Sequence, residues 1–316
     1  MSKVGLTKLK HKIQDHMLLG SIYDNIMLKT KYRGEKLSFL YNVMVAQKHR
    51  MLYYKRLKKK YVARCTAKRE WEATNKQVNT NTVWVCWLQG MDAAPELVKR
   101  CYESLQKQLP DKTIVLLDQN NIFEYITMPE DIVRKWQDGI IGAAHFTDLV
   151  RIELLLKYGG YWIDATVLCT DATLLRQVEQ EPLFMYSFYY FGFNPEIMEL
   201  NNWLIYSSTD NNVLYLVREL LYTYWREHNR AVHYFIFHLF LTMALEYYEE
   251  DYKNMPIVSQ ADAHILATYI FDEFDQKKYD ILCRQTGIHK LSTRFDAEGM
   301  KKQGTFYDVV IRRGEF

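Results

Sequence analysis

Cysteine is scarce in this chain, and no two cysteines form a C-x-x-C pair. The five cysteines are widely separated among 316 residues, which argues against a structural zinc site and against a disulfide framework. The chain also has only 6 prolines and 13 glycines, too few for a fibrous or disordered protein. We therefore expect a globular protein whose thiols stay reduced, as they do in the cytosol.

Long apolar runs are also missing. The longest ones, residues 183–193 and 231–245, are shorter than the about 20 residues that a membrane-spanning helix needs. The first twelve residues are polar and basic and lack the apolar stretch of a signal peptide. These absences predict a cytoplasmic protein that is either soluble or attached to a membrane from its surface.

Charge is distributed unevenly along the chain. Residues 1–80 carry 19 Lys and Arg against 5 Asp and Glu, a net charge of +14, whereas residues 81–316 carry 22 against 33, a net charge of −11. A strongly basic segment favours an anionic partner, either nucleic acid or a membrane. Because no recognisable nucleic-acid-binding motif accompanies the charge, we expect a membrane surface and no nucleic acid.

The basic segment predicts a long helix. Residues 35–89 contain neither Gly nor Pro, and residues 41–71 are rich in side chains that favour helix. Its cations alternate with apolar residues and form one cluster: Lys55, Arg56, Lys58, Lys59 and Lys60. Such a helix can lie on anionic lipid at the inner face of the cell membrane, or it can pack on the rest of the protein. The sequence leaves both alternatives open.

An α/β pattern begins after the basic segment. Residues 82–88 form an apolar run typical of a buried strand, residues 95–109 have helical spacing, and residues 112–117 form a second apolar strand. Strand, helix and strand in this order indicate a mostly parallel sheet flanked by helices. We therefore divide the chain into a basic, mainly helical segment at residues 1–80 and an α/β domain at residues 81–316.

The most informative stretch of the sequence is residues 144–167. It predicts a helix over residues 147–158 with Thr147 as its N-cap, followed by a Gly-Gly turn whose first residue, Gly159, takes a positive φ. A short buried strand over residues 161–164 comes next. The stretch therefore predicts a helix, a tight turn and a strand in immediate succession.

Three charged side chains of this stretch are expected to share one site. Asp148 and Arg151 are three residues apart on one helix face, and Asp164 ends the strand. Ligands of open α/β sheets bind beyond the carboxyl ends of the strands. A buried carboxylate there needs a cation, which is Arg151 in a structural site or a metal ion bridging a nucleotide diphosphate in a functional one. The combined spacings favour the functional interpretation.

These residues resemble a known donor site. The pattern Ser/Thr-Asp-x-x-Arg followed by Gly-Gly-x-x-x-Asp, here residues 147–164, is similar to that of glycosyltransferase family 32 and the clostridial glucosylating toxins. Together with residues 84–90, it looks most like the bacterial capsular polysaccharide synthesis glycosyltransferases. The resemblance covers about residues 82–170 well and continues more loosely at residues 234–238 and 288–292.

The resemblance implies a GT-A-like fold and a specific reaction. A member of this family moves a hexose from a nucleotide diphosphate sugar to a saccharide acceptor, expected to be lipid-linked, in the synthesis of capsular or other surface polysaccharide. The resemblance also implies that the anomeric configuration is retained. The alternative is a non-catalytic protein on a degenerate transferase fold, which would bind polysaccharide or an anionic surface.

The resemblance also assigns roles to individual residues. It identifies Asp164, Arg151 and Asp148 as catalytic residues and places Trp84 against the nucleobase. The full set of donor-binding residues is Trp84, Gly90, Thr147, Asp148, Arg151 and Lys290.

The resemblance further implies a divalent cation, Mn²⁺ or Mg²⁺. Asp164 takes the metal-binding place of an Asp-x-Asp element, and His289 is a candidate further ligand. The element here reads Asp-Ala-Thr, however, so its second carboxylate is missing. His233 and His238 are five residues apart and would not share one helical face, so we expect separate packing or acceptor roles for them.

Overall fold

A central β-sheet organises the protein, which is seen here in a computed structural model. The structure describes residues 3–15, 17–31, 35–67, 81–188, 197, 199–208 and 210–315. Within these residues five strands form the sheet in the order β2-β1-β3-β6-β5. The strands are β1 (Thr82–Cys86), β2 (Thr113–Leu117), β3 (Gly160–Ile163), β5 (Leu183–Ser187) and β6 (Leu200–Ser207). All but β6 run in the same direction, so the predicted mostly parallel α/β sheet is confirmed.

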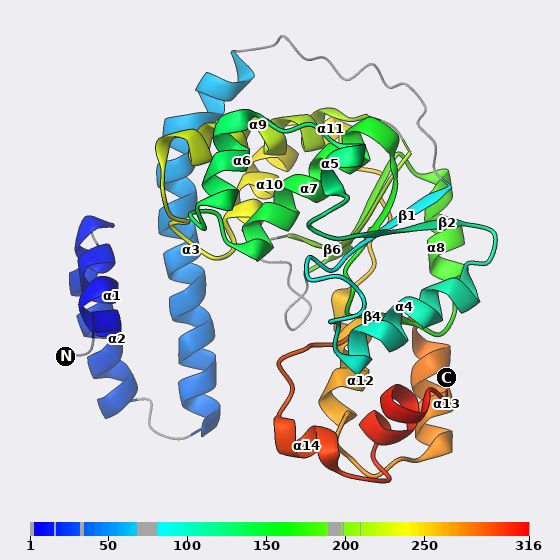
Figure 1. The fold of residues 1–316 in the computed structure, drawn as a ribbon. Helices are drawn as coiled ribbons and strands as arrows, with labels where there is room; N and C mark the ends of the chain where they lie inside the picture. The colour runs from blue at the N-terminus through cyan, green and yellow to red at the C-terminus, as the bar shows by residue number, and fades with distance from the viewer. Residues whose placement is uncertain are drawn as a thin grey trace.

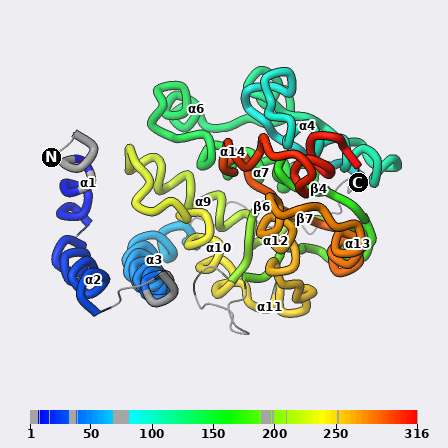
Figure 2. The backbone as a smooth tube through the Cα atoms, turned by 90° about the horizontal axis from the view of Figure 1, so that it is seen from below, coloured from blue at the N-terminus to red at the C-terminus, as the bar shows by residue number. Residues whose placement is uncertain are grey.

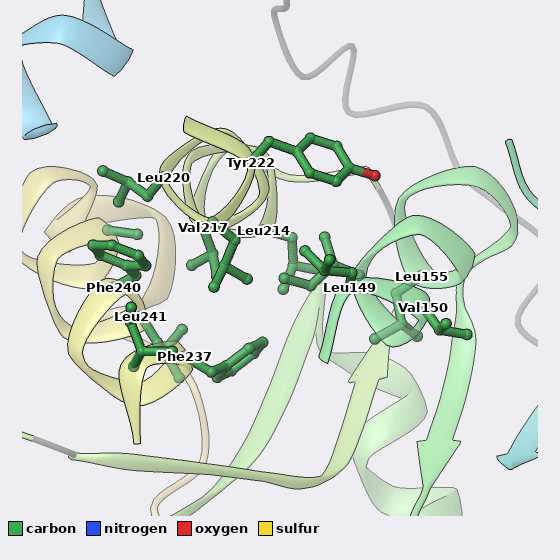
Figure 3. Packing of buried hydrophobic residues seen from close by; sticks show 14 of the residues in the cluster. Leu149, Val150, Leu155, Leu214, Val217, Leu220, Tyr222, Phe237, Phe240 and Leu241 are labelled. Carbon is green, nitrogen blue, oxygen red and sulfur yellow. The ribbon is translucent and has the colours of Figure 1, made fainter. Parts of the chain in front are cut away.

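Helices cover both faces of the sheet because its strands are apolar on both sides. One face carries α6 (Glu130–Gln137), α7 (Ala143–Tyr158), α9 (Asn212–Glu227) and α10 (Ile236–Tyr247) (Figure 1). In this layer Leu149 and Leu155 of α7 face Leu214 and Val217 of α9 and Phe237 of α10 (Figure 3). This packing holds α7 firmly against the sheet.

The opposite face carries α4 (Glu96–Gln108), α12 (Gln260–Tyr269) and α13 (Gln276–Gln285). A second, two-stranded sheet joins this layer and pairs β4 (Val167–Cys169) with β7 (Ile288–Lys290). The remaining short elements are α5 (Ile122–Tyr125), α8 (Thr173–Gln177), η1 (Val178–Gln180), α11 (Glu249–Tyr252), α14 (Ala297–Lys301) and η2 (Tyr307–Arg313). The strand pairing β4·β7 brings the C-terminal part of the chain next to the end of β3.

The turn between α7 and β3 requires glycine. Gly159 and Gly160 both have positive φ angles, 66° and 84°. A Cβ on Gly160 would lie 2.2 Å from the carbonyl oxygen of Thr82 on the neighbouring strand β1. The backbone can therefore turn from the helix directly into the sheet only because this position has no side chain.

The predicted start of α7 was wrong. The helix begins at Ala143, after Gly142, and Thr147 lies inside it, donating its hydroxyl to the carbonyl oxygen of Ala144 at 2.9 Å. The extra turn forms because Phe146 is buried and stacks on Trp136, with ring centroids 4.3 Å apart. Buried aromatic packing thus extends the helix beyond the point where a capping residue would have started it.

The basic segment contains the three helices α1 (Lys3–Gln14), α2 (Leu18–Thr30) and α3 (Glu35–Thr66). The last of these is the predicted long helix, and it packs on the body: Tyr54, Leu57, Tyr61 and Cys65 belong to the same buried cluster as α9 and α10. The helices α1 and α2 lie outside α3 at the edge of the molecule (Figures 1 and 2). The proposed boundary at residue 80 falls in residues 68–80, outside the described chain, and stays a prediction.

Three cations of α3 have partners on the body. Lys58 forms an ion pair with Glu246 of α10, and both Lys60 and Arg64 pair with Glu227 of α9, at 2.8 and 2.6 Å. Of the two alternatives left open for this helix, the structure therefore shows the packed one for these residues. None of the helices in the described part of the chain combines the length and the apolar character needed to cross a membrane.

Candidate active site

A cavity of about 320 Å³ lies beyond the carboxyl end of β3. Its walls come from α7, from the loop after β3, from β6, from α10 with the residues just before it, and from β7. The sequence-predicted residues Thr147, Asp148, Arg151, Asp164 and Lys290 all line it. Residues from four separate parts of the sequence, α7 with the end of β3, β6, the start of α10 and β7, thus meet where open α/β sheets bind their ligands.

Asp164 is held at the end of β3 through both its backbone and its side chain. Its backbone N–H donates to the carbonyl oxygen of Trp203 on β6 at 2.8 Å, and Trp162 Nε1 donates to its Oδ1 at 3.0 Å. The carboxylate lies between two cations, Lys290 Nζ at 3.2 Å from Oδ2 and an Arg151 nitrogen at 3.7 Å from Oδ1. Its side chain is 28% exposed and faces the cavity.

The two cations keep Asp164 ionised. Burial by itself would raise the pKa of the Asp164 carboxyl, but the charges of Lys290 and Arg151 outweigh this effect and lower the pKa below its ordinary value. At neutral pH the cavity therefore presents a negative charge at this position, held in place by two positive ones.

Arg151 is the centre of the polar network. Its side chain is only 6% exposed and pairs with Asp148 Oδ1 at 3.3 Å. It also donates to the carbonyl oxygens of Thr147, at 3.3 Å, and Asn202. The guanidinium stacks over the Trp162 ring, 4.8 Å from its centroid. The predicted Asp148–Arg151 pair is thus present, and it is buried rather than exposed on a helix surface.

Asp148 has partners that sequence reasoning missed. Asn202 of β6 donates its Nδ2 to Asp148 Oδ1 at 2.8 Å, and His145 Nδ1 lies 3.8 Å from Oδ2. No spacing in the sequence relates Asn202 to α7. Its strand, β6, was not predicted, and it comes next to Asp148 through the antiparallel pairing of β6 with β3. His145 is one turn before Asp148 on α7, and its position only follows from the corrected start of that helix.

Lys290 and His289 are neighbours on β7 but point to opposite sides, as consecutive strand residues do. Lys290 Nζ donates to the Thr166 hydroxyl and pairs with Asp164. His289 is fully buried and lies outside the cavity lining, with Nε2 3.1 Å from the Thr170 hydroxyl oxygen. Burial lowers the pKa of His289 to about 4, so its ring is neutral at pH 7. Its metal role stays a prediction that this placement does not favour.

Trp84 and Gly90 also lie away from the cavity lining. The Trp84 ring is buried between Tyr125 and Tyr158, and its Nε1 donates to the carbonyl oxygen of Gly159 at 3.0 Å. Gly90, with a φ of 79°, forms the turn that follows β1. In this structure Trp84 braces the turn between α7 and β3, and its contact with a nucleobase stays a prediction.

Further residues that were not predicted as donor-site residues line the cavity, among them Trp203, Tyr234 and His238. Burial lowers the pKa of His238 to about 3, so it is neutral at physiological pH. His233 instead packs against Tyr53 on α3, with ring centroids 5.7 Å apart. The exposed Tyr234 ring lies 5.9 Å from that of His145 and provides an aromatic surface at the cavity.

One carboxylate at the cavity, that of Asp164, could share a metal ion with a substrate. Among the described residues no three His, Cys, Asp or Glu side chains come close enough to hold a metal by themselves. Mg²⁺ and Mn²⁺, however, are commonly bound by one or two carboxylates, with phosphate oxygens and water completing the coordination. Asp164 is a carboxylate of that kind, and the Thr166 hydroxyl takes the place where an Asp-x-Asp element has its second acid.

The family described as "Capsular polysaccharide synthesis protein" matches residues 34–310. The O-glycosyltransferase braB of Annulohypoxylon truncatum is 35% identical over 119 residues, which are 34% of this chain and 27% of braB. The glycosyltransferase afumC of Aspergillus fumigatus is 26% identical over 162 residues, which are 46% of this chain and 41% of afumC.

These matches differ in how much they cover. The alignments span about a quarter to two fifths of the length of the two curated relatives. Both relatives come from fungi, and a bacterial origin of this chain stays a prediction. Among solved structures, the PaToxG glycosyltransferase aligns with a TM-score of 0.39 and 12% identity, over 66% of this chain and 79% of that one.

Proposed function

Because this chain belongs to the family of capsular polysaccharide synthesis proteins, we propose that it is a glycosyltransferase with a GT-A-like fold. It moves a hexose from a nucleotide diphosphate sugar to a saccharide acceptor that is lipid-linked, and the anomeric configuration is retained. The observation that carries this proposal is the convergence of Asp148, Arg151, Asp164 and Lys290 on one cavity beyond β3. The names of the two curated relatives support it.

The charged side chains of the cavity have different roles. Lys290 and Arg151 provide the positive charge that a diphosphate requires, and both are already oriented by carboxylates before the donor arrives. Asp148 is a hydrogen-bond acceptor for sugar or ribose hydroxyls. A donor held in this way has its leaving group close to Lys290, whose ammonium stabilises the negative charge that develops as the glycosidic bond breaks.

A divalent cation would be held by Asp164 together with the diphosphate. When bound, it would supply further positive charge to the leaving group. The protein contributes one carboxylate to such a site, so the affinity of the protein for the metal alone should be low. Metal and nucleotide are therefore expected to bind together.

Thermal unfolding tests this coupling. We expect that Mn²⁺ alone leaves the melting temperature unchanged, whereas Mn²⁺ with the nucleoside diphosphate that binds raises it by a few degrees, since a ligand that binds only the folded state stabilises it. EDTA should remove most of that rise, and Asp164→Asn should remove the contribution of the metal. Equal stabilisation by Mn²⁺ alone, or a rise insensitive to EDTA, would contradict a shared metal.

A panel of nucleotide sugars tests the function itself. Glycosyltransferases that lack their acceptor transfer the sugar slowly to water, so one donor of the panel should release its nucleoside diphosphate in the presence of Mn²⁺. The donor of the panel that is turned over identifies the sugar, and the mass of the released nucleotide confirms the base. Turnover of none of the donors, together with tight binding of a polysaccharide, would favour the non-catalytic alternative instead.

A further inference from the structure

The helix α2 carries its apolar side on the outside of the protein. Leu19, Ile22, Tyr23 and Ile26 follow the i, i+3, i+4, i+7 spacing of one helix face, and they are 82%, 48%, 58% and 54% exposed. A surface helix of a globular protein normally turns such a face toward the core. Here the described residues leave it uncovered.

The opposite, inward face of α2 is polar and is held in place. Ser21 and Asp24 are buried on this side. Asp24 Oδ1 accepts hydrogen bonds from Lys48 at 2.9 Å and from Tyr41 at 3.2 Å, both on α3. Rotating the helix to bury its apolar face would bring Asp24 out of these contacts and leave Lys48 without its carboxylate. The ion pair therefore fixes the orientation of α2 with the apolar face outward.

The charges that α1 and α2 expose in the described residues have one sign. Residues 3–31 contain six lysines and two aspartates. Both aspartates are engaged inside the protein, Asp24 with Lys48 and Asp15 with Arg230 at 2.6 Å. Among the charges of α1 and α2 that the structure shows at the surface are four lysines: Lys10, Lys12, Lys29 and Lys31.

We propose that the outer face of α2 docks this protein on the surface of an anionic lipid bilayer. Leu19, Ile22, Tyr23 and Ile26 enter the boundary between headgroups and acyl chains, and the surrounding lysines contact the anionic headgroups. The helix lies in the plane of the membrane and does not cross it. This surface is distinct from the basic cluster on α3, where Lys58 and Lys60 pair with glutamates of the body.

The charges favour lipid over a second copy of the chain. A two-fold contact between two α2 faces would bring the same lysine-rich surroundings of both copies together, and like charges at an interface oppose association. A lipid surface with negative headgroups can bind the apolar side chains and the lysines at the same time. The inference does not depend on the transferase activity, because it uses none of the residues at the cavity.

Vesicle sedimentation tests the proposal with the full chain. We expect binding to phosphatidylcholine vesicles that contain phosphatidylglycerol, weak binding to phosphatidylcholine alone, and a steep loss at high salt. The triple variant L19S/I22S/I26S should lower the partition coefficient ~100-fold or more, since it removes three apolar side chains from the bilayer. Replacing the four lysines by glutamine should weaken binding roughly fivefold for each charge.

A matched control uses exposed apolar residues elsewhere. Ile257 and Ile281 are exposed as well, and α13, which carries Ile281, lies at the far side of the molecule from α2 (Figure 1). The variant I257S/I281S should bind vesicles like the unchanged protein. Circular dichroism should show that all variants keep their helices, because the altered side chains are on the surface.

Three results would overturn the proposal. The first is vesicle binding that survives the triple serine change, and the second is equal binding to neutral and anionic vesicles. The third is a protein that does not bind vesicles but forms a dimer, detected by size-exclusion chromatography with light scattering, when the triple serine variant is a monomer. That last result would identify the face as an interface between two copies.

Discussion

Replacing Asp164 by asparagine is expected to lower turnover ~100-fold or more, the effect of removing a charge that is preorganised in an active site. The amide keeps the size of the side chain and an acceptor oxygen for Trp162 Nε1. It loses the negative charge that orients Lys290 and Arg151. Because the backbone of Asp164 is held independently by the carbonyl oxygen of Trp203, the variant should still fold. Release of nucleoside diphosphate under saturating donor measures the effect.

The same substitution at Asp111 is the matched control. Asp111 forms an exposed ion pair with Arg176 at 2.7 Å and is not among the residues that line the cavity. Asp111→Asn should therefore leave turnover unchanged. If Asp164→Asn is folded, as judged by its melting temperature, and still turns over at the original rate, Asp164 has no part in the reaction.

Replacing Arg151 by alanine is expected to have the largest effect on stability. The free energy of unfolding should fall by about 3 to 5 kcal/mol, the usual consequence of removing one partner from a buried ion pair. Asp148 would keep Asn202 but lose its cation, and Asp164 would keep Lys290 as its one remaining cation of the two described here. The Asn202 carbonyl oxygen would lose a donor. Denaturant titration followed by tryptophan fluorescence measures the loss.

A second variant separates folding from donor binding. Arg151→Lys keeps the charge, so it should fold, but an ammonium cannot reach Asp148, Asp164 and the Asn202 carbonyl oxygen at the same time. We expect its donor affinity to fall by about 2 to 3 kcal/mol, the scale of a charged hydrogen bond lost from a desolvated site. Titration calorimetry with donor checks this, and unchanged affinity would restrict Arg151 to a structural role.

A double-mutant cycle tests whether Arg151 and Asp148 act as a unit. Adding Asp148→Asn to Arg151→Ala removes the carboxylate that the single variant leaves uncompensated. The double variant should therefore lose less stability than the sum of the two single losses. Additive losses would show that the two residues contribute to stability independently. Arg176→Ala, which breaks the exposed pair with Asp111, should change stability little.

Much of the fold could be predicted because its elements have clear local patterns. The apolar runs of β1 and β2 and the helical spacing of α4 lie within a residue or two of their predicted bounds. The strand β6 was missed because its first residues, Leu-Asn-Asn-Trp, show neither an apolar run nor a strict alternation. The apolar run at residues 183–193 contains β5, and its part past Phe188 falls on residues outside the described chain.

What the sequence determined by itself is the part of the site whose geometry is local. The spacing of Asp148 and Arg151 follows from the pitch of a helix, and the exit of Asp164 beyond β3 follows from the Gly-Gly turn and the short strand, whatever the rest of the chain does. The net positive charge of the first 80 residues is likewise a property of composition. These features need no knowledge of which elements pack together.

The tertiary structure alone decided which distant residues complete the site and which faces stay exposed. Lys290 reaches Asp164 through the pairing of β7 with β4, and Asn202 reaches Asp148 through the pairing of β6 with β3. The register of such short strands is set by packing over the whole domain and leaves no local signal. The outward face of α2 depends in the same way on the contacts of Asp24 with Lys48 and Tyr41, which form only when α2 and α3 are already side by side.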